Sequence, residues 1–265
     1  MGAESSATSD AELGDLAEKV QNPVANMVSV PLQNNTSFDI GPYRRASNVL
    51  NVQPIIPVSF TEDWNLTNRV IMPIGYAPDL NHPTDGASGV GDLQWTGFFS
   101  PTKTGEFIWG AGPVLQFPTA TQTALGTGHW TVGPSAVALW QSKPWTIGAL
   151  ANNMWSYAGQ DGRSAVNQLF VQYFVNYNLA AGWFLTSSPI ITANWKASSD
   201  SIWTIPFGGG VGKIFKIGSQ AMSAQVAAFW NAASPNEGGA AWQSRLQLGF
   251  LFPEKQSSSL TAGAF

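Results

Sequence analysis

The spacing of tryptophan in residues 130–155 is the feature that most limits the fold of this chain. The stretch WTVGPSAVALWQSKPWTIGALANNMW has gaps of ten, five and ten residues between Trp130, Trp140, Trp145 and Trp155. An α-helical stripe would repeat every three or four residues, and none of these gaps suits it well. Two β-strands joined by a tight turn accommodate the spacing, with one tryptophan at each end of each strand.

Alternation with a period of two predicts strands along most of the remaining chain. In LNVQPIIPVSF (residues 50–60) and WQSRLQLGFLF (residues 242–252), apolar side chains fall on one face and more polar ones on the other. The same pattern predicts twelve strands, near residues 27–40, 48–60, 64–76, 92–100, 106–118, 130–141, 145–157, 166–178, 183–196, 202–213, 220–231 and 241–252.

The connections between these strands alternate between short and long. TED, PTKTG and SKP are short, whereas APDLNHPTDGASGVG, TATQTALGTGH and AGQDGRSA are longer and rich in turn-forming residues. An even-stranded antiparallel barrel has tight turns at one rim and loops at the other. We therefore expect residues 27–252 to form an all-β, 12-stranded antiparallel transmembrane β-barrel of the outer-membrane type. Its short turns and both termini would be periplasmic, and its longer loops extracellular.

The composition favours a barrel surrounded by lipid. Only 11% of the 265 residues are charged, 44% are hydrophobic and 12 are tryptophan, so a soluble protein would have few polar groups to cover its surface. No run of 18 apolar residues predicts a transmembrane helix. The net charge of −4 and the lack of a basic block argue against nucleic acid as a partner, and the absence of cysteine excludes disulfides and thiolate metal sites.

Tryptophans ten residues apart on one strand are separated by roughly 33 Å along it. A strand tilt of about 40° reduces this to roughly 25 Å, the height of the apolar band of an outer-membrane barrel. All twelve tryptophans can be sorted by rim on this basis, which predicts two membrane-interface girdles in contact with outer-membrane lipid. The alternative is a soluble all-β protein with tryptophans in its core. The short-turn rim receives Trp64, Trp109, Trp140, Trp145 and Trp183, and the loop rim receives Trp95, Trp130, Trp155, Trp195, Trp203, Trp230 and Trp242.

Two terminal segments lie outside the predicted barrel. In residues 1–26, SDAELGDLAEKVQNP has a Ser/Asp capping signal, apolar residues at helical spacing and a stop before Pro23. This segment is expected to be a periplasmic tail or a short helix at the rim, with a plug as the alternative. Residues 253–265 form a C-terminal tail. No signal peptide is visible at the amino terminus, so we expect an exported protein to have this chain as its mature form.

Several long motifs also resemble a known family. QNPVANMVSVPLQNNTSFDIGP, NVLNVQPIIPVSFTEDWNL, VGPSAVALWQ, LTSSPIITANW and WTIPFGGGVGKIFKIG are similar to bacterial outer-membrane proteins related to the MetA-pathway phenol-degradation barrels, often labelled "transporter" and sometimes neuromedin U. The resemblance covers about residues 20–253 and implies a Gram-negative outer-membrane β-barrel. It implies no catalytic residue and no substrate.

The residues that could support chemistry do not form a convincing catalytic, metal or cofactor site. GGGVGK at 208–213 lacks the first glycine and the Ser/Thr of a phosphate-binding loop. His82 and His129 fall in different predicted loops, which is a weak metal signal. Asp92 and Glu106 fall at opposite rims, too far apart for shared acid–base work. We therefore expect no cofactor and no enzymatic activity, with His129 the best candidate if the protein is an outer-membrane enzyme.

The inward face of the predicted barrel is mostly amide and hydroxyl in character. A barrel of twelve strands lies between eight-stranded barrels, which are filled by side chains, and sixteen-stranded barrels, which are open. The expected function is porin-like passive passage of small, mostly neutral or weakly anionic solutes, including those with aromatic or apolar parts. The alternative is a closed structural or binding barrel; the sequence does not predict the oligomeric state. The pore-lining candidates are Gln53, Arg69, Gln94, Gln116, Asn152, Gln172, Thr192, Lys196, Gln225, Arg245 and Gln247.

Overall fold

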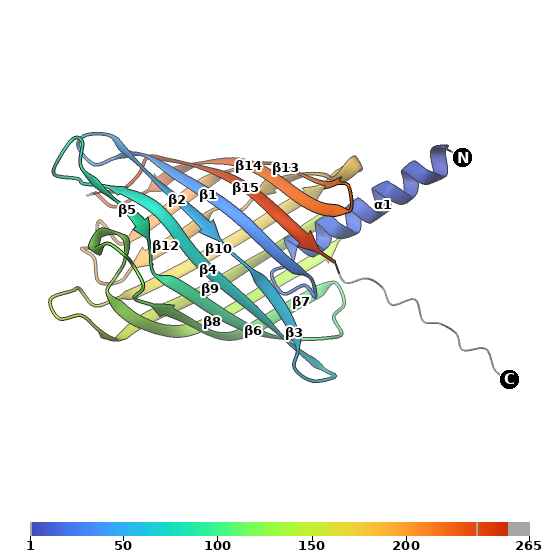
Figure 1. Ribbon diagram of the computed structural model, residues 1–265, viewed down its shortest axis with the longest axis horizontal. Helices are drawn as coiled ribbons and strands as arrows, with labels where there is room; N and C mark the ends of the chain where they lie inside the picture. The colour runs from blue at the N-terminus through green and yellow to red at the C-terminus, as the bar shows by residue number, and fades with distance from the viewer. Residues whose placement is uncertain (1, 237, 254–265) are drawn as a thin grey trace.

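The computed structural model describes the backbone of residues 2–236 and 238–253, and the side chains from residue 12 onward. Its elements are one long helix and a set of long, tilted strands that wrap into a single barrel (Figure 1). Residues 254–265, most of the expected C-terminal tail, lie outside the described residues.

Fifteen strand segments form one antiparallel sheet that closes on itself, because β1 pairs with β15 and β9 pairs with β10. The helix is α1 (Gly2–Gln21), and the short 3₁₀ turns are η1 (Thr123–Leu125) and η2 (Ala180–Gly182). The strands are β1 (Val28–Ile40), β2 (Arg45–Val52), β3 (Ile55–Ser59), β4 (Trp64–Pro78), β5 (Gly86–Val90), β6 (Leu93–Pro101), β7 (Phe107–Phe117), β8 (His129–Ser142), β9 (Trp145–Gly159), β10 (Asn167–Asn178), β11 (Trp183–Ser187), β12 (Ile190–Asn194), β13 (Trp203–Ile217), β14 (Gln220–Ala233) and β15 (Trp242–Phe252).

Three pairs of these segments are the two halves of one interrupted strand, so the wall has twelve strands. β2 and β3 both pair with β1 and β4, β5 and β6 both pair with β4, and β11 and β12 both pair with β10 and β13. The prediction of a twelve-stranded antiparallel barrel is therefore confirmed. β1 begins and β15 ends at the end of the barrel where α1 lies, which is also the end with the short turns (Figure 1).

The three interruptions have a common consequence for the interior. Proline has no N–H to donate to a ladder, which accounts for the breaks before Pro54 and Pro189, while the third falls at Gly91. Beside each break a polar side chain is buried: Gln53 at 3% exposure, Asp92 at 9% and Ser188 at 9%. The breaks thus bring polar groups into the interior, and at Ser188 the break leaves a backbone carbonyl that accepts from side chains.

The alternating pattern that predicts the strands is visible directly in β8. From His129 to Trp140, buried and exposed residues alternate without exception, with Val137 and Leu139 among the inward side chains. The outer face of the barrel carries large exposed apolar side chains, including Leu185, Phe207 and Leu246. The interior instead receives the small, polar and remaining apolar side chains, as expected for an outer-membrane barrel.

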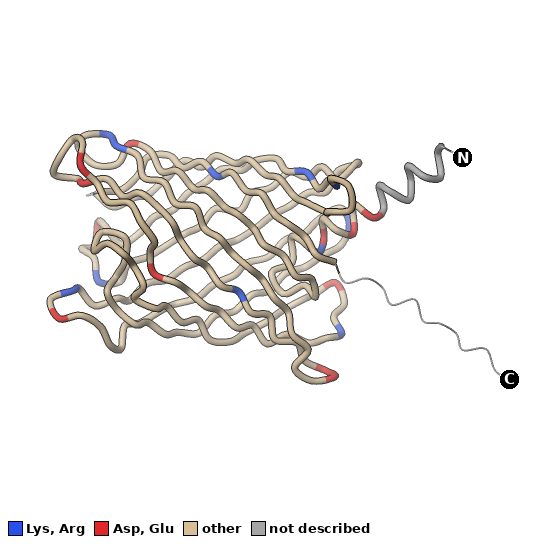
Figure 2. Tube along the Cα trace, viewed as in Figure 1, with Lys and Arg blue, Asp and Glu red and all other residues tan. Residues whose placement is uncertain are grey.

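Charged residues lie mainly at the two ends of the barrel, with few along the wall between them (Figure 2). This distribution leaves a band of the outer surface without strongly hydrated groups, which is what a lipid environment requires. No helix in the described part of the chain is long and apolar enough to cross a membrane.

Eleven of the twelve tryptophan side chains are exposed, with between 37% and 51% of their surface accessible. Several begin a strand at one rim, among them Trp64, Trp145 and Trp183 at the short-turn rim and Trp203 and Trp242 at the loop rim. Their role as membrane-interface girdles stays a prediction.

Trp95 departs from its expected place near the loop rim. The expected strand begins at residue 92, but β5 extends this strand back to Gly86, so Trp95 lies within the wall opposite Val70 and Leu115. Its side chain is half-buried, and its Nε1 donates to Oδ1 of Asn68 at 3.2 Å. GVGD (residues 89–92) interrupts the alternation of apolar and polar residues, so the pattern did not predict the first half of this strand.

At the loop rim, the buried carboxylate of Asp92 holds the segment 118–128 in place. It accepts hydrogen bonds from the backbone N–H of Thr127 at 2.6 Å and the Thr127 hydroxyl at 2.9 Å. It also accepts from the backbone N–H of Ala120 and from Nε2 of Gln116, each at 3.2 Å. One carboxylate therefore ties a long loop to β7 and to the break between β5 and β6.

Replacing Asp92 with alanine should loosen segment 118–128 while leaving the barrel closed. Each hydrogen bond to a charged group contributes about 1.5–3 kcal/mol, and four donors would lose their acceptor together. We expect faster limited proteolysis within 118–128 in the folded, detergent-solubilised protein. Asp161→Ala is the control, because Asp161 is an exposed acid in another loop of the same rim. Equal cleavage rates in the two variants would show that Asp92 does not hold the loop.

Candidate functional site: the lumen cavity

A cavity of about 140 Å³ lies inside the barrel, and we call it the lumen cavity. Its walls come from strands on several sides of the barrel, and its floor includes Val20 and Gln21 at the end of α1. Six of the expected pore-lining residues line it: Gln53, Arg69, Gln172, Gln225, Arg245 and Gln247. The structure therefore brings together polar residues from four different strands and from the break after β2.

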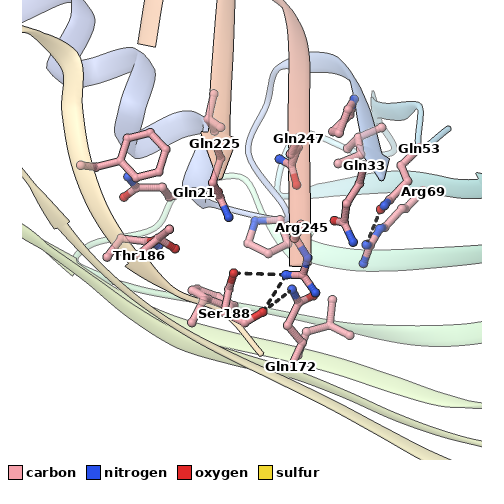
Figure 3. A pocket seen from close by; sticks show the side chains of 18 residues that line it. Gln21, Gln33, Gln53, Arg69, Gln172, Thr186, Ser188, Gln225, Arg245 and Gln247 are labelled. Carbon is pink, nitrogen blue, oxygen red and sulfur yellow. Dashed lines mark hydrogen bonds between the residues drawn. The ribbon is translucent and has the colours of Figure 1, made fainter. Parts of the chain in front are cut away.

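Arg245 on β15 is buried, with 3% of its surface exposed, and connects distant parts of the wall. Its Nε donates to Oδ1 of Asn35 on β1 at 2.9 Å. Its Nη1 donates to the backbone oxygen of Ser188 at 2.8 Å and to the Ser188 hydroxyl at 3.3 Å (Figure 3). The guanidinium also lies over the ring of Phe229, 5.1 Å from its centroid.

The break between β11 and β12 explains why Ser188 can receive Arg245. Because Ser188 and Pro189 interrupt the strand, the Ser188 carbonyl is available to side chains instead of a neighbouring strand. It accepts from Arg245 and also from Nε2 of Gln172, at 3.4 Å. The interrupted part of this strand therefore supplies a hydrogen-bond acceptor to the lumen cavity.

Arg69 on β4 has far fewer partners. Its Nη2 donates to Oε1 of Gln53 at 2.7 Å, beside the break between β2 and β3 (Figure 3). Its Nε is fully covered and has no hydrogen-bond acceptor among the described residues. A guanidinium has five N–H donors, so most of those of Arg69 are left to whatever else occupies the cavity.

The electrostatic character of the lumen cavity is set by these two arginines. Among its lining residues in the described chain there is no Asp or Glu, and no ion pair there involves Arg69 or Arg245. The remaining polar lining is neutral, mostly amide. Two positive charges therefore face one small space without a carboxylate to balance them.

Four lining or supporting residues were missed by the sequence reasoning: Gln21, Gln33, Asn35 and Asn176. Gln33 donates through Nε2 to Oδ1 of Asn35 at 3.2 Å and so orients the acceptor of Arg245. The run QNNTS in β1 is polar on both faces, since Asn34 on the other face hydrogen-bonds Asn48. Alternation therefore gave no signal in this part of the strand.

The other expected pore-lining residues lie elsewhere. Gln116 binds Asp92 near the loop rim, and Gln94 lies opposite it on β6. Asn152 is buried on β9, where its Oδ1 lacks a donor among the described residues. Thr192 lies near the loop rim, and Lys196 is exposed beyond the end of β12, outside the lumen cavity.

One side of the interior is filled by apolar side chains. A cluster of buried residues from β6 to β10, together with Val24 after α1, packs beside the lumen cavity and shares Leu150 and Phe174 with it. The cluster consists of Val24, Phe98, Ile108, Val137, Leu139, Leu150 and Phe174. The cavity is therefore polar on one part of its wall and apolar on another.

The C-terminal half of α1 occupies the short-turn mouth of the barrel (Figure 1). Leu16 and Ala17 are buried against inward side chains of the wall, including Phe184, Ile214 and Leu251. The expected periplasmic tail or rim helix is thus a long helix, and its second half sits where a plug would sit. Its location in the periplasm stays a prediction.

Polar contacts fix the rotation of α1 in this mouth. Nε2 of Gln141 donates to the backbone oxygen of Glu18 at 2.9 Å, and Gln21 exchanges side-chain hydrogen bonds with Asn178 at 2.8 and 3.3 Å. Lys143 pairs with Asp15, at 3.0 Å between Nζ and Oδ1. These polar contacts come from the neighbouring ends of β8 and β10, while the apolar contacts of the helix with Leu251 come from β15.

The position of α1 in the mouth shifts the pKa values of ionisable groups near it. Burial raises the pKa of Glu18, and the nearby Lys143 opposes that shift. The hydrogen bond to Asp15 raises the pKa of Lys143. Lys216 on β13 pairs with Glu12, at 2.6 Å between Nζ and Oε1. Exposed pairs of this kind contribute little individually, so the buried apolar side chains contribute most to holding the helix.

His129 is buried, with 9% of its surface exposed, at the start of β8. Its Nδ1 lies 3.3 Å from the backbone oxygen of Ala158 and its Nε2 lies 3.4 Å from that of Arg163. The two ring nitrogens thus lie near one carbonyl oxygen of β9 and one of the loop 160–166. His82 lies in another loop, where its pKa is raised by a hydrogen bond to Asp79.

No group of three or more His, Asp or Glu side chains that could bind a metal ion occurs in the described part of the chain. The geometry of the lumen cavity offers fixed hydrogen-bond donors and a confined apolar surface. It is suited to holding or passing a small molecule.

The fold is similar to that of solved outer-membrane channels. An outer membrane channel from Pseudomonas putida F1 aligns with a TM-score of 0.65 at 18% sequence identity, covering 85% of this chain and 96% of the other. The NanC porin aligns with a TM-score of 0.54 at 10% identity, covering 86% of this chain and all of the other.

No protein-family model matches the sequence, and no curated protein is similar to it. The outer membrane phospholipase A of Escherichia coli aligns with a TM-score of only 0.40 at 11% identity, which carries no argument about activity. The strand pairing and the similarity to the two channels agree. This chain is a closed twelve-stranded antiparallel barrel that resembles outer-membrane channels.

Proposed function

We propose that the protein is a passive, non-enzymatic channel for small, mostly neutral or weakly anionic solutes in the outer membrane of a Gram-negative bacterium. The observation that carries this proposal is the polar, acid-free lumen cavity enclosed by a barrel with an apolar outer surface. Diffusion through a channel requires binding that is weak, and neutral amides with few charges provide weak binding. No covalent step and no cofactor is part of this function.

The proposed orientation has the short turns, α1 and both chain ends on the periplasmic side, and the longer loops outside the cell. Outer-membrane barrels commonly have short periplasmic turns and longer extracellular loops. Trp140 and Trp195 expose their rings while their Nε1 atoms donate to Glu106 and Asn153, at 3.1 and 2.9 Å. This combination of an exposed ring and a bonded N–H suits a lipid boundary and supports the two tryptophan girdles.

We also propose a relationship to the MetA-pathway phenol-degradation barrels, on the basis of the motifs quoted above. This relationship by itself names no cargo, and the expected solutes include those with aromatic or apolar parts. The apolar side chains in the lumen cavity, among them Phe174 and Phe184, are consistent with such cargo.

In this function α1 acts as a displaceable plug of the periplasmic mouth. Buried Leu16 and Ala17 hold the helix in place, and the surrounding contacts are mostly exposed pairs or single hydrogen bonds. The second candidate function is a closed barrel with a structural or binding role, and the same seated helix favours it. The two candidates differ in whether the lumen conducts once α1 is out of the mouth.

Removing residues 2–21 should convert a weakly conducting barrel into one with a larger and steadier conductance, because the deletion empties the periplasmic mouth. Single-channel recording in planar bilayers would compare the full chain with the truncated chain, each refolded and shown to retain its β-sheet content. Leu16→Asp, which places a charge at a buried contact of the helix, should act in the same direction in the full-length protein. A truncated barrel that inserts but stays silent would favour the closed barrel.

The open lumen should prefer anions over cations, because Arg69 and Arg245 face the lumen cavity, whose described lining contains no Asp or Glu. The buried Asp92 carboxylate lies near the loop rim and already accepts four hydrogen bonds there. In a potassium chloride gradient, the reversal potential of the truncated barrel should show anion preference. Arg69→Gln should reduce this preference, whereas Lys103→Gln removes an exposed charge in a short turn and should change it little. Cation preference in the parent barrel would contradict the proposed role of the lumen charges.

A further inference from the structure

Arg69 and Arg245 in the lumen cavity have N–H donors that no acceptor among the described residues receives. Arg245 uses Nε and Nη1, and no acceptor among the described residues receives its Nη2. Arg69 uses only Nη2, and its covered Nε has no acceptor within the described part of the chain. A guanidinium taken out of water is costly unless it is paired and hydrogen-bonded, so this arrangement favours an added anion.

The chemistry of the guanidinium group favours a planar, two-oxygen anion as this acceptor. Guanidinium groups bind carboxylates through two parallel N–H···O bonds, and such charge-assisted bonds are stronger than bonds between neutral groups. The acceptors already bound to these arginines are neutral: the amides of Gln53 and Asn35 and the oxygens of Ser188. A carboxylate would supply the negative charge that these neutral partners lack.

The rest of the lumen cavity limits what can be attached to that carboxylate. Ile55, Leu150, Phe174 and Phe184 line the same space, and its volume is about 140 Å³. An engineered apolar protein cavity of about 150 Å³ holds one benzene molecule. The apolar body of a ligand here should therefore be close to a single six-membered ring in size.

We propose that the lumen cavity is a binding subsite for small amphipathic organic acids, in which Arg69 and Arg245 hold the carboxylate and the apolar lining holds a ring-sized body. The inference rests on the proposed channel function for its physiological meaning and names the class of solute that the channel would select. Binding itself requires only the cavity and does not depend on whether the barrel conducts.

Binding of benzoate to the refolded full-length protein tests the proposal. The protein is refolded in a series of probe concentrations, so that α1 does not limit access, and the dissociation constant is measured by equilibrium dialysis. Benzyl alcohol keeps the ring and lacks the charge, acetate keeps the carboxylate and lacks the ring, and inorganic phosphate is an anion of another shape. We expect benzoate to bind more tightly than each of these three.

Arg69→Gln should weaken benzoate binding roughly tenfold or more, since at least one hydrogen bond between charged groups is lost. Arg69→Lys keeps the charge without the two-pronged donor and should restore only part of the affinity. Lys103→Gln makes the same charge change at an exposed turn and should alter it less than about twofold. As a site-specific readout, the Nε–H resonance of Arg69 should shift on addition of benzoate and not of benzyl alcohol.

Several outcomes would overturn the subsite. Equal binding of benzyl alcohol would remove the role of the arginines, and equal binding of acetate or phosphate would remove the role of the apolar lining. A lower melting temperature for Arg69→Gln with unchanged benzoate affinity would show that Arg69 serves only to hold the barrel together. Benzoate binding in a barrel that never conducts would instead leave the subsite standing and remove the channel function.

Discussion

The closure of the backbone ladder is the constraint on which the rest of the structure depends. A strand edge exposed to hydrocarbon would leave a row of unpaired N–H and C=O groups, so a sheet that spans a membrane must join its own ends. Here the pairing of Val28 with Phe252 through Phe38 with Trp242 completes that closure. Once the wall is closed, the two-residue period of the strands forces every second side chain inward, and the interior is built from whatever residues occupy those positions.

The interior shows how departures from a regular ladder can create a site. The breaks at Gln53, Asp92 and Ser188 turn buried polar side chains, and in one case a backbone carbonyl, toward the lumen. Arg69 and Arg245 bind at two of these breaks, and the loop 118–128 is tied to the third. A strand without these interruptions would have used the same backbone groups in the ladder. The interruptions in the wall therefore determine which polar groups face the lumen.

The helix α1 adds a different kind of interaction, because it joins segments far apart in the chain without any backbone pairing. Its seat depends on a small apolar contact at Leu16 and Ala17, surrounded by hydrogen bonds and exposed ion pairs. Such a contact is weaker than a strand ladder, so we expect the helix to leave the mouth more readily than any strand leaves the barrel. This difference in strength makes α1 the part of the molecule best suited to control access to the lumen cavity.

The sequence by itself determined the strand count and the antiparallel order, because a period of two and alternating turn lengths are local signals. It offered eleven pore-lining candidates and gave no means of telling which six lie around the lumen cavity. It did not reveal the breaks within strands, the middle position of Trp95 or the polar role of Gln33, since these depend on partner strands. Only the tertiary structure decided which inward residues meet, that the described lining around Arg69 and Arg245 contains no carboxylate, and that the C-terminal half of α1 lies in the mouth. The physical reason is that the alternation within a strand determines on which face of the sheet a side chain lies. Closure of the barrel determines which side chains of other strands lie opposite it.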